Sequence, residues 1–319
     1  MAAATSFPLH RLPTKVIVHI IQILNFQEMI AIASLSQKLK SLCKAANHKA
    51  RIARVSICRF IHILVARDFD TDRFYFRFHY KPEDTQLATP TYIRVGSMHE
   101  GKTMECRSLE IDLIFEFFER RSSRSLVFRQ GCEQLDLGVV KQKLRPFERL
   151  EISHEVNNEY SKKILTEMAK DAKTLLCSIN PYRNPEDFQK FLVQNLQEFE
   201  WNFTLDDLLI CNSSMVYNNL LIRTNLSEKK INRFLKLWRN GANRNLKTMI
   251  LAVGENSNAH EVLRGLSYRE FPSGQRRIVE RAYPEENQEI FGGFDICRVD
   301  GTKGSILFDA RGMVFYVWS

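Results

Sequence analysis

The chain is 319 residues long, enough for one large domain or two to three small ones, and 44% of its residues are hydrophobic without any run long enough to span a membrane. The formal net charge of +9 comes from Lys and Arg residues scattered among acidic ones, so charge alone does not indicate a nucleic-acid-binding tail. The seven cysteines lack any CxxC spacing and the N-terminus lacks the pattern of a secretion signal, so we expect reduced thiols and a cytoplasmic or nuclear location.

Residues 1–50 predict three short helices. Pro13 suits the first turn of a helix because its missing N–H is not needed there, and apolar residues then recur at helical spacing. Asn25 and Glu28 form a capping pattern for a second helix, and Ser36 precedes a third, Lys-rich helix. A unit of roughly forty residues has too little interior to bury all this apolar surface, so we expect part of it to dock on another polypeptide. The predicted docking residues are Leu12, Pro13, Val16, Ile17, Ile20, Ile21 and Leu24.

The next segment changes to a strand pattern. Ile61–Val65 and Phe74–Phe78 predict a β-hairpin, with its turn in the region Asp68–Arg73. Two prolines indicate a loop over Lys81–Thr91, and Tyr92–Val95 predicts another short strand.

From about residue 110, short apolar segments recur at a loose period of roughly 21 to 27 residues, with helical stretches between them. Asn184 and Ser227 are expected to cap two of these helices, the second of which ends near Gly241. A strand and a helix at this period are typical of leucine-rich-repeat-like solenoids, while a single doubly wound sheet with short helices is the alternative. The apolar segments are Leu126–Phe128, Leu150–Ile152, Leu175–Cys177, Phe199–Trp201, Leu220–Ile222 and Met249–Leu251.

The C-terminal residues predict a β-hairpin. Asp300-Gly301 can supply a two-residue turn between Phe294–Val299 and Thr302–Phe308. The alternation of Val314, Tyr316 and Trp318 predicts one further strand.

Three blocks of residues resemble one known family. The first is Phe7-Pro8-Leu9, Leu12-Pro13, Val16, Ile20-Ile21, Leu24, Glu28-Met29-Ile30 and Ser34-Leu35-Ser36 with Lys38 and Lys40. It resembles an F-box, in the form found in the large nematode F-box family. Two later blocks resemble the associated domain that follows the F-box in that family: Leu226-Ser227, Ile231-Asn232, Phe234-Leu235-Lys236, Trp238, Gly241, Asn243 and Leu246, and then Gly293–Ile296, Arg298 and Asp300–Lys303.

This resemblance implies that the helical module binds the small adaptor subunit of an SCF-type cullin-RING ubiquitin ligase, and through it a cullin. The rest of the chain would then capture a protein substrate. In the family this role is played by a non-catalytic protein, and we find no catalytic constellation, metal-ligand spacing or cofactor motif that argues otherwise.

We therefore predict an α/β protein with a three-helix F-box followed by an irregular leucine-rich-repeat-like α/β solenoid that ends in a β-hairpin. The expected parts are the F-box at 1–50, a β-rich connecting region at 51–109, a repeat-like substrate-binding region at 110–265, and the C-terminal loop and hairpin of the associated domain at 266–319.

Two alternatives use other residues. Gly96–Thr103 fits the phosphate-binding pattern GxxxxGK[ST], in which Lys102 and Thr103 would contact phosphate and Mg²⁺. Glu100 would place a carboxylate beside the phosphates, so a nucleotide-binding enzyme is the lesser alternative. A nucleic-acid-binding protein would use a helix-turn-helix near residues 14–45 and four basic clusters: Arg120-Arg121 with Arg124; Lys141, Lys143 and Arg145; Lys229-Lys230 with Arg233; and Arg276-Arg277.

Overall fold

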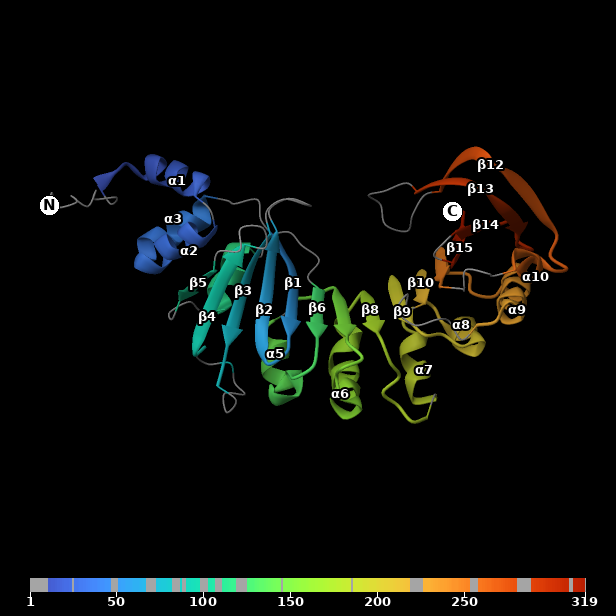
Figure 1. Ribbon diagram of the computed structural model, residues 1–319, viewed down its shortest axis with the longest axis horizontal. Helices are drawn as coiled ribbons and strands as arrows, with labels where there is room; N and C mark the ends of the chain where they lie inside the picture. The colour runs from blue at the N-terminus through green and yellow to red at the C-terminus, as the bar shows by residue number, and fades with distance from the viewer. Residues whose placement is uncertain are drawn as a thin grey trace. The chain divides into compact units, whose positions relative to one another are not determined.

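Figure 1 shows the computed structural model of the chain. It describes residues 11–24, 26–46, 51–66, 73–81, 87, 90–97, 103–106, 111–118, 125–144, 146–184, 186–218, 226–252, 258–279, 288–309 and 312–318. The chain divides into two compact units, unit 1 (Met1–Phe147) and unit 2 (Glu148–Ser319). The fold is mixed α/β, with helices at the N-terminus and a mixed sheet in each unit. No helix among the described residues combines the length and apolar character that crossing a membrane needs.

Unit 1 begins with the three predicted helices, α1 (Thr14–Ile23), α2 (Phe26–Leu35) and α3 (Gln37–Ala45). The carbonyl of Pro13 accepts the first intrahelical hydrogen bonds of α1, as expected for a residue at the helix start. Ser36 caps α3, because its hydroxyl accepts a hydrogen bond from the Leu39 N–H at 3.2 Å. The expected cap of α2, Asn25, lies outside the described residues.

The sheet of unit 1 runs in the order β6-β1-β2-β3-β4-β5. The predicted hairpin is confirmed, since β2 and β3 are antiparallel neighbours in which Ile63 lies opposite Phe76. The predicted strand at Tyr92–Val95 is confirmed as β4, whereas β1 and β5 were not predicted. The elements are β1 (Arg51–Ile57), β2 (Phe60–Ala66), β3 (Arg73–His79), β4 (Tyr92–Ser97), β5 (Thr103–Cys106), α4 (Ile111–Phe118), β6 (Ser125–Phe128), the 3₁₀ turn Cys132–Gln134 and α5 (Leu137–Lys143).

Unit 2 contains five parallel strands that are neighbours in chain order, from β7 to β11. Right-handed crossovers between successive parallel strands place the connecting helices on one side of the sheet. Figure 1 shows α6, α7, α8 and α9 following one another along that side. The elements are β7 (Arg149–Ile152), α6 (Asn158–Met168), the 3₁₀ turn Ala169–Asp171, β8 (Thr174–Cys177), α7 (Glu186–Leu192), β9 (Glu198–Trp201), α8 (Leu205–Ile210), β10 (Met215–Asn218), α9 (Glu228–Arg239), β11 (Thr248–Leu251) and α10 (Ala259–Leu263).

Most of the recurring apolar segments are strands. The one expected at Leu220–Ile222 lies outside the described residues, and the strand of that interval, β10, precedes it at Met215–Asn218. Asn184 starts α7 as predicted, because its side-chain oxygen accepts from the Glu186 N–H at 3.3 Å. Ser227 stands at the N-cap of α9, but its side chain makes no capping hydrogen bond, so that part of the prediction was wrong.

The sheet of unit 2 ends in four antiparallel strands, and β15 pairs with β11. These strands are β12 (Tyr268–Val279), β13 (Gln288–Cys297), β14 (Lys303–Asp309) and β15 (Gly312–Val317). β13 and β14 form the predicted hairpin, but the prediction of a two-residue turn was wrong. The Gly301 N–H donates to the Arg298 carbonyl at 2.9 Å, and Gly301 has φ +88° while Asp300 has no positive φ. This is a three-residue loop with a glycine bulge, which needs positive φ at one residue only.

A buried contact joins α9 to this antiparallel end. Trp238 meets Phe315 edge-on, with ring centroids 4.9 Å apart and planes at 87°. The Arg298 guanidinium lies 5.3 Å from the centre of the Trp238 ring and pairs with Asp300 at 2.8 Å. Gly304 leaves room for both rings, because a Cβ there would come within 2.5 Å of Phe315 and 3.0 Å of Trp238.

We expect Gly304→Ala to lower the free energy of unfolding of unit 2 by about 1–3 kcal/mol, because the added methyl group overpacks this core. Gly274→Ala on β12 is the control, since a Cβ there would have no neighbour within 4 Å. It should change stability by less than about 0.5 kcal/mol. Denaturant unfolding of both variants measures the difference, and equal stabilities would contradict the packing described.

Candidate functional site

Helix α1 is apolar on two different sides. Ile17 and Ile21 are 1% and 0% exposed, so they form the core of the three-helix module. Val16 and Ile23 are 42% and 74% exposed, and Ile20 between them is half-buried. Positions 16, 20 and 23 are spaced by four and three residues, which places them on one side of a helix. We call Val16, Ile20 and Ile23 the outer face of α1.

The seven predicted docking residues therefore occupy different environments. Val16 and Pro13 are exposed, while Leu12, Ile20 and Leu24 are half-buried. The buried pair described above can offer no surface to a partner while the module stays folded. The family residues Phe7-Pro8-Leu9 lie outside the described residues.

Sequence reasoning missed two exposed side chains, Ile23 and Leu35. Leu35 is 72% exposed at the end of α2. Ile23 could have been found from its spacing, since it lies three positions after Ile20 and seven after Val16. Among the described residues of unit 1, the exposed large hydrophobic side chains all lie on α1 and α2. Within the described part of unit 1, the exposed apolar surface is thus concentrated on the helical module.

Truncating a buried and an exposed side chain of α1 should affect the stability of the module to different degrees. Ile21→Ala should destabilise the module by about 2–5 kcal/mol, because it leaves a cavity in a small core. Ile23→Ala should change stability by less than about 0.5 kcal/mol, because its side chain is exposed. Helical circular dichroism during thermal unfolding of the full-length variants measures both, and equal losses would contradict the division into two sides.

A groove of about 930 Å³ lies in unit 2. It is formed where the chain leaves β8 and β9 and by the facing helices α7, α8 and α9. The carboxyl ends of neighbouring parallel strands meet at one edge of a sheet, and such edges commonly form ligand sites in α/β proteins. The lining residues are Ser178, Ile179, Asn180, Phe188, Gln189, Trp201, Asn202, Thr204, Leu205, Asp206, Asp207, Lys229, Lys230 and Arg233.

Phe188 and Trp201 form the apolar part of the groove wall. Their rings stack with centroids 4.0 Å apart and an angle of 22°, and the side chains are 2% and 4% exposed. The Oδ1 atom of Asn202 is buried and has no hydrogen-bond partner among the residues that the structure describes. The two packed rings give the groove a largely apolar wall.

Three cations of the groove come from α9. Lys229, Lys230 and Arg233 are exposed, and none of them pairs with a carboxylate among the described residues. Two acidic residues lie opposite, in the first turn of α8. Asp207 is engaged in a capping box with Thr204, through hydrogen bonds of 2.8 Å and 3.2 Å. Asp207 therefore stabilises the start of α8, whereas the three cations form no ion pair with a carboxylate in the described part of the chain.

The family-like residues of α9 have a structural role. Its buried residues are Ile231, Asn232, Phe234, Leu235 and Trp238. The Asn232 amide donates to the carbonyls of Val262 at 2.7 Å and Arg264 at 2.9 Å, which fixes α10 against α9. Asn243, at φ +50°, donates to the Leu208 carbonyl at 2.6 Å. These residues define the fold, whereas the exposed cations of α9 line the groove.

The phosphate-loop alternative conflicts with the geometry. A phosphate-binding loop connects a strand to a helix whose N-terminus holds the phosphates. Here Gly96 lies in β4 and pairs directly with Thr103, the first residue of strand β5. Lys102 lies outside the described residues. The sequence match therefore falls on a β-hairpin, and this alternative was wrong.

The described members of the basic clusters lie on different elements. Lys141 and Lys143 belong to α5 of unit 1, and the Lys143 ammonium donates to the Leu87 carbonyl at 3.1 Å. Arg276 and Arg277 on β12 are each paired with a carboxylate of β13. Arg120, Arg121, Arg124 and Arg145 lie outside the described residues. Of the described clusters, the one on α9 alone lines the groove.

Outside the groove, the described titratable groups show no arrangement typical of a catalytic or metal site. Burial raises the pKa of the Cys43 thiol to about 11 and that of Cys177 to about 12, so both stay protonated at neutral pH. Burial and the nearby Arg77 guanidinium lower the pKa of His62 to about 4, so this ring is neutral at pH 7. Within the described parts of the chain, no group of three His, Cys, Asp or Glu residues could hold a metal ion.

Comparison with protein families yields two matches. The F-box domain model matches residues 9–50, which include α1, α2 and α3. The model described as F-box associated matches residues 187–251, a range that includes every groove-lining residue except Ser178, Ile179 and Asn180. The two matches confirm the F-box and the F-box-associated domain expected from the sequence, while the third block of the resemblance, at 293–303, lies outside both. No curated protein and no solved structure gives a significant match to the chain.

Proposed function

Since the chain is an F-box protein that also carries an F-box-associated domain, we propose that it serves as the substrate-recognition subunit of an SCF-type cullin-RING ubiquitin ligase. F-box domains bind the small adaptor subunit of these ligases, and both families are typically non-catalytic adaptor components. The observation that carries the proposal is the exposed apolar surface of α1 and α2, which lies within the F-box match.

The outer face of α1, together with Leu12, Pro13, Leu24 and Leu35, is the proposed adaptor contact. Full burial of one aliphatic side chain contributes on the order of 1.5–3 kcal/mol. Ile23 and Leu35 are 74% and 72% exposed, so most of this free energy is still to be gained when a partner covers them, and Val16, 42% exposed, would add a smaller share. The buried pair Ile17 and Ile21 acts indirectly, by holding α1 in place.

Unit 2 is the proposed substrate-binding part. Its strands β7 to β11 alternate with helices in chain order, which supports an irregular leucine-rich-repeat-like arrangement. Catalysis would come from proximity, because a substrate held beside a ubiquitin-charged enzyme reacts in an effectively unimolecular step. The free thiols among the described cysteines support a location in the cytoplasm or nucleus.

The double variant Val16→Asp with Ile23→Asp should lose the adaptor in a pull-down of the full-length chain, because two carboxylates would be buried at an apolar contact. Lys15→Asp changes the charge by the same two units at an exposed position of α1 that lies off the outer face, and it should retain the adaptor. Thermal unfolding of both variants should match the parent chain. Undiminished adaptor capture by the folded double variant would refute the proposed contact.

A further inference from the structure

We propose that the groove of unit 2 binds an acidic peptide segment of the protein substrate. Carboxylates of the peptide would lie against Lys229, Lys230 and Arg233, and its backbone along the wall that contains Trp201. That the peptide belongs to a ubiquitination substrate rests on the proposed function, whereas binding of the peptide itself does not.

The first reason to expect an acidic ligand is the placement of positive charges on α9. Lys229 and Lys230 lie in the first turn of this twelve-residue helix, where the positive end of the helix dipole disfavours cations. The two lysines and Arg233 have no carboxylate partner among the described residues. These charges therefore stabilise the fold through no ion pair among the described residues. An anion placed in the groove would compensate all three.

The two acidic residues of the groove do not cancel this potential. Asp206 and Asp207 lie in the first turn of α8, where the helix dipole favours negative charge. Asp207 also accepts the Thr204 N–H at 2.8 Å. Their charges are thus partly compensated within the protein, and those on α9 are not.

The groove suits a peptide better than a nucleic acid. Single-stranded nucleic acids bind by stacking bases on exposed aromatic rings. Phe188 and Trp201 stack on each other instead and are almost fully buried, so neither ring is free for a base.

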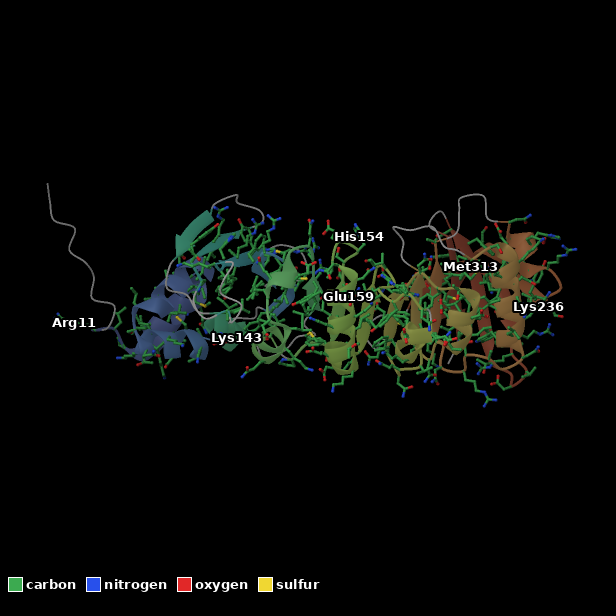
Figure 2. The ribbon with its side chains drawn as sticks, turned by 90° about the horizontal axis from the view of Figure 1, so that it is seen from below. Arg11, Lys143, His154, Glu159, Lys236 and Met313 are labelled. Atoms are coloured by element: carbon green, nitrogen blue, oxygen red, sulfur yellow. The ribbon has the colours of Figure 1, made fainter. Side chains whose placement is uncertain are left out.

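The test is fluorescence anisotropy with the full-length chain and a short labelled peptide of Glu, Asp and interspersed Leu residues. We expect Lys229→Ala with Lys230→Ala to weaken binding at least about tenfold, because two charge-assisted contacts are lost. The matched control is Lys170→Ala with Lys236→Ala. Both control lysines are exposed in unit 2 and lie outside the groove lining, and Lys236 is labelled in Figure 2. The control should leave the affinity unchanged.

Added salt should weaken binding, and a peptide with Gln and Asn in place of Glu and Asp should not bind. Equal affinities of the two double variants, equal binding of the neutral peptide, or tighter binding of a labelled single-stranded oligonucleotide would each overturn the proposal. The melting temperature should stay equal or rise in Lys229→Ala with Lys230→Ala, because the unfavourable first-turn charges are removed. A lower melting temperature would show that these lysines serve folding, against the proposal.

Adaptor pull-down on the same variants separates this inference from the proposed function. Both double variants should retain the adaptor, because their substitutions lie in unit 2. Failed peptide binding with retained adaptor would defeat the inference alone. Peptide binding without any adaptor capture by the parent chain would defeat the proposed function alone.

Discussion

The architecture depends on one packing constraint. A module of three short helices is too small to bury all the apolar side chains of α1. α1 places Ile17 and Ile21 inside and leaves Val16 and Ile23 outside, so its second apolar side needs a cover from elsewhere. Exposed aliphatic surface of this kind is costly in water unless a partner removes it. The F-box match covers the same residues, and F-box domains bind the small adaptor subunit of SCF ligases.

Unit 2 separates folding from recognition within a single helix. On α9, buried residues such as Trp238 and Asn232 fix the helix against the antiparallel strands and α10, while three exposed cations of the same helix line the groove. Substitution of these cations therefore leaves the buried contacts of α9 intact.

Periodicity in the sequence was enough to predict the N-terminal helices and the β2–β3 hairpin. It could not distinguish Val16 from Ile17, because both sides of α1 are apolar and only packing decides which is buried. β12 was missed because Pro272 and Gly274 are typical of a turn, yet an irregularity in the pairing with β13 accommodates them within the strand. The groove was not predictable, because its residues come from segments that only the parallel crossovers bring together.

Hydrogen exchange of the full-length chain, with and without the small adaptor subunit of an SCF ligase, tests the central claim most directly. The account predicts slower exchange in α1 and α2 when the adaptor is added, and unchanged exchange in α9 beside the groove. Unchanged exchange in α1 at saturating adaptor, or protection confined to unit 2, would contradict it.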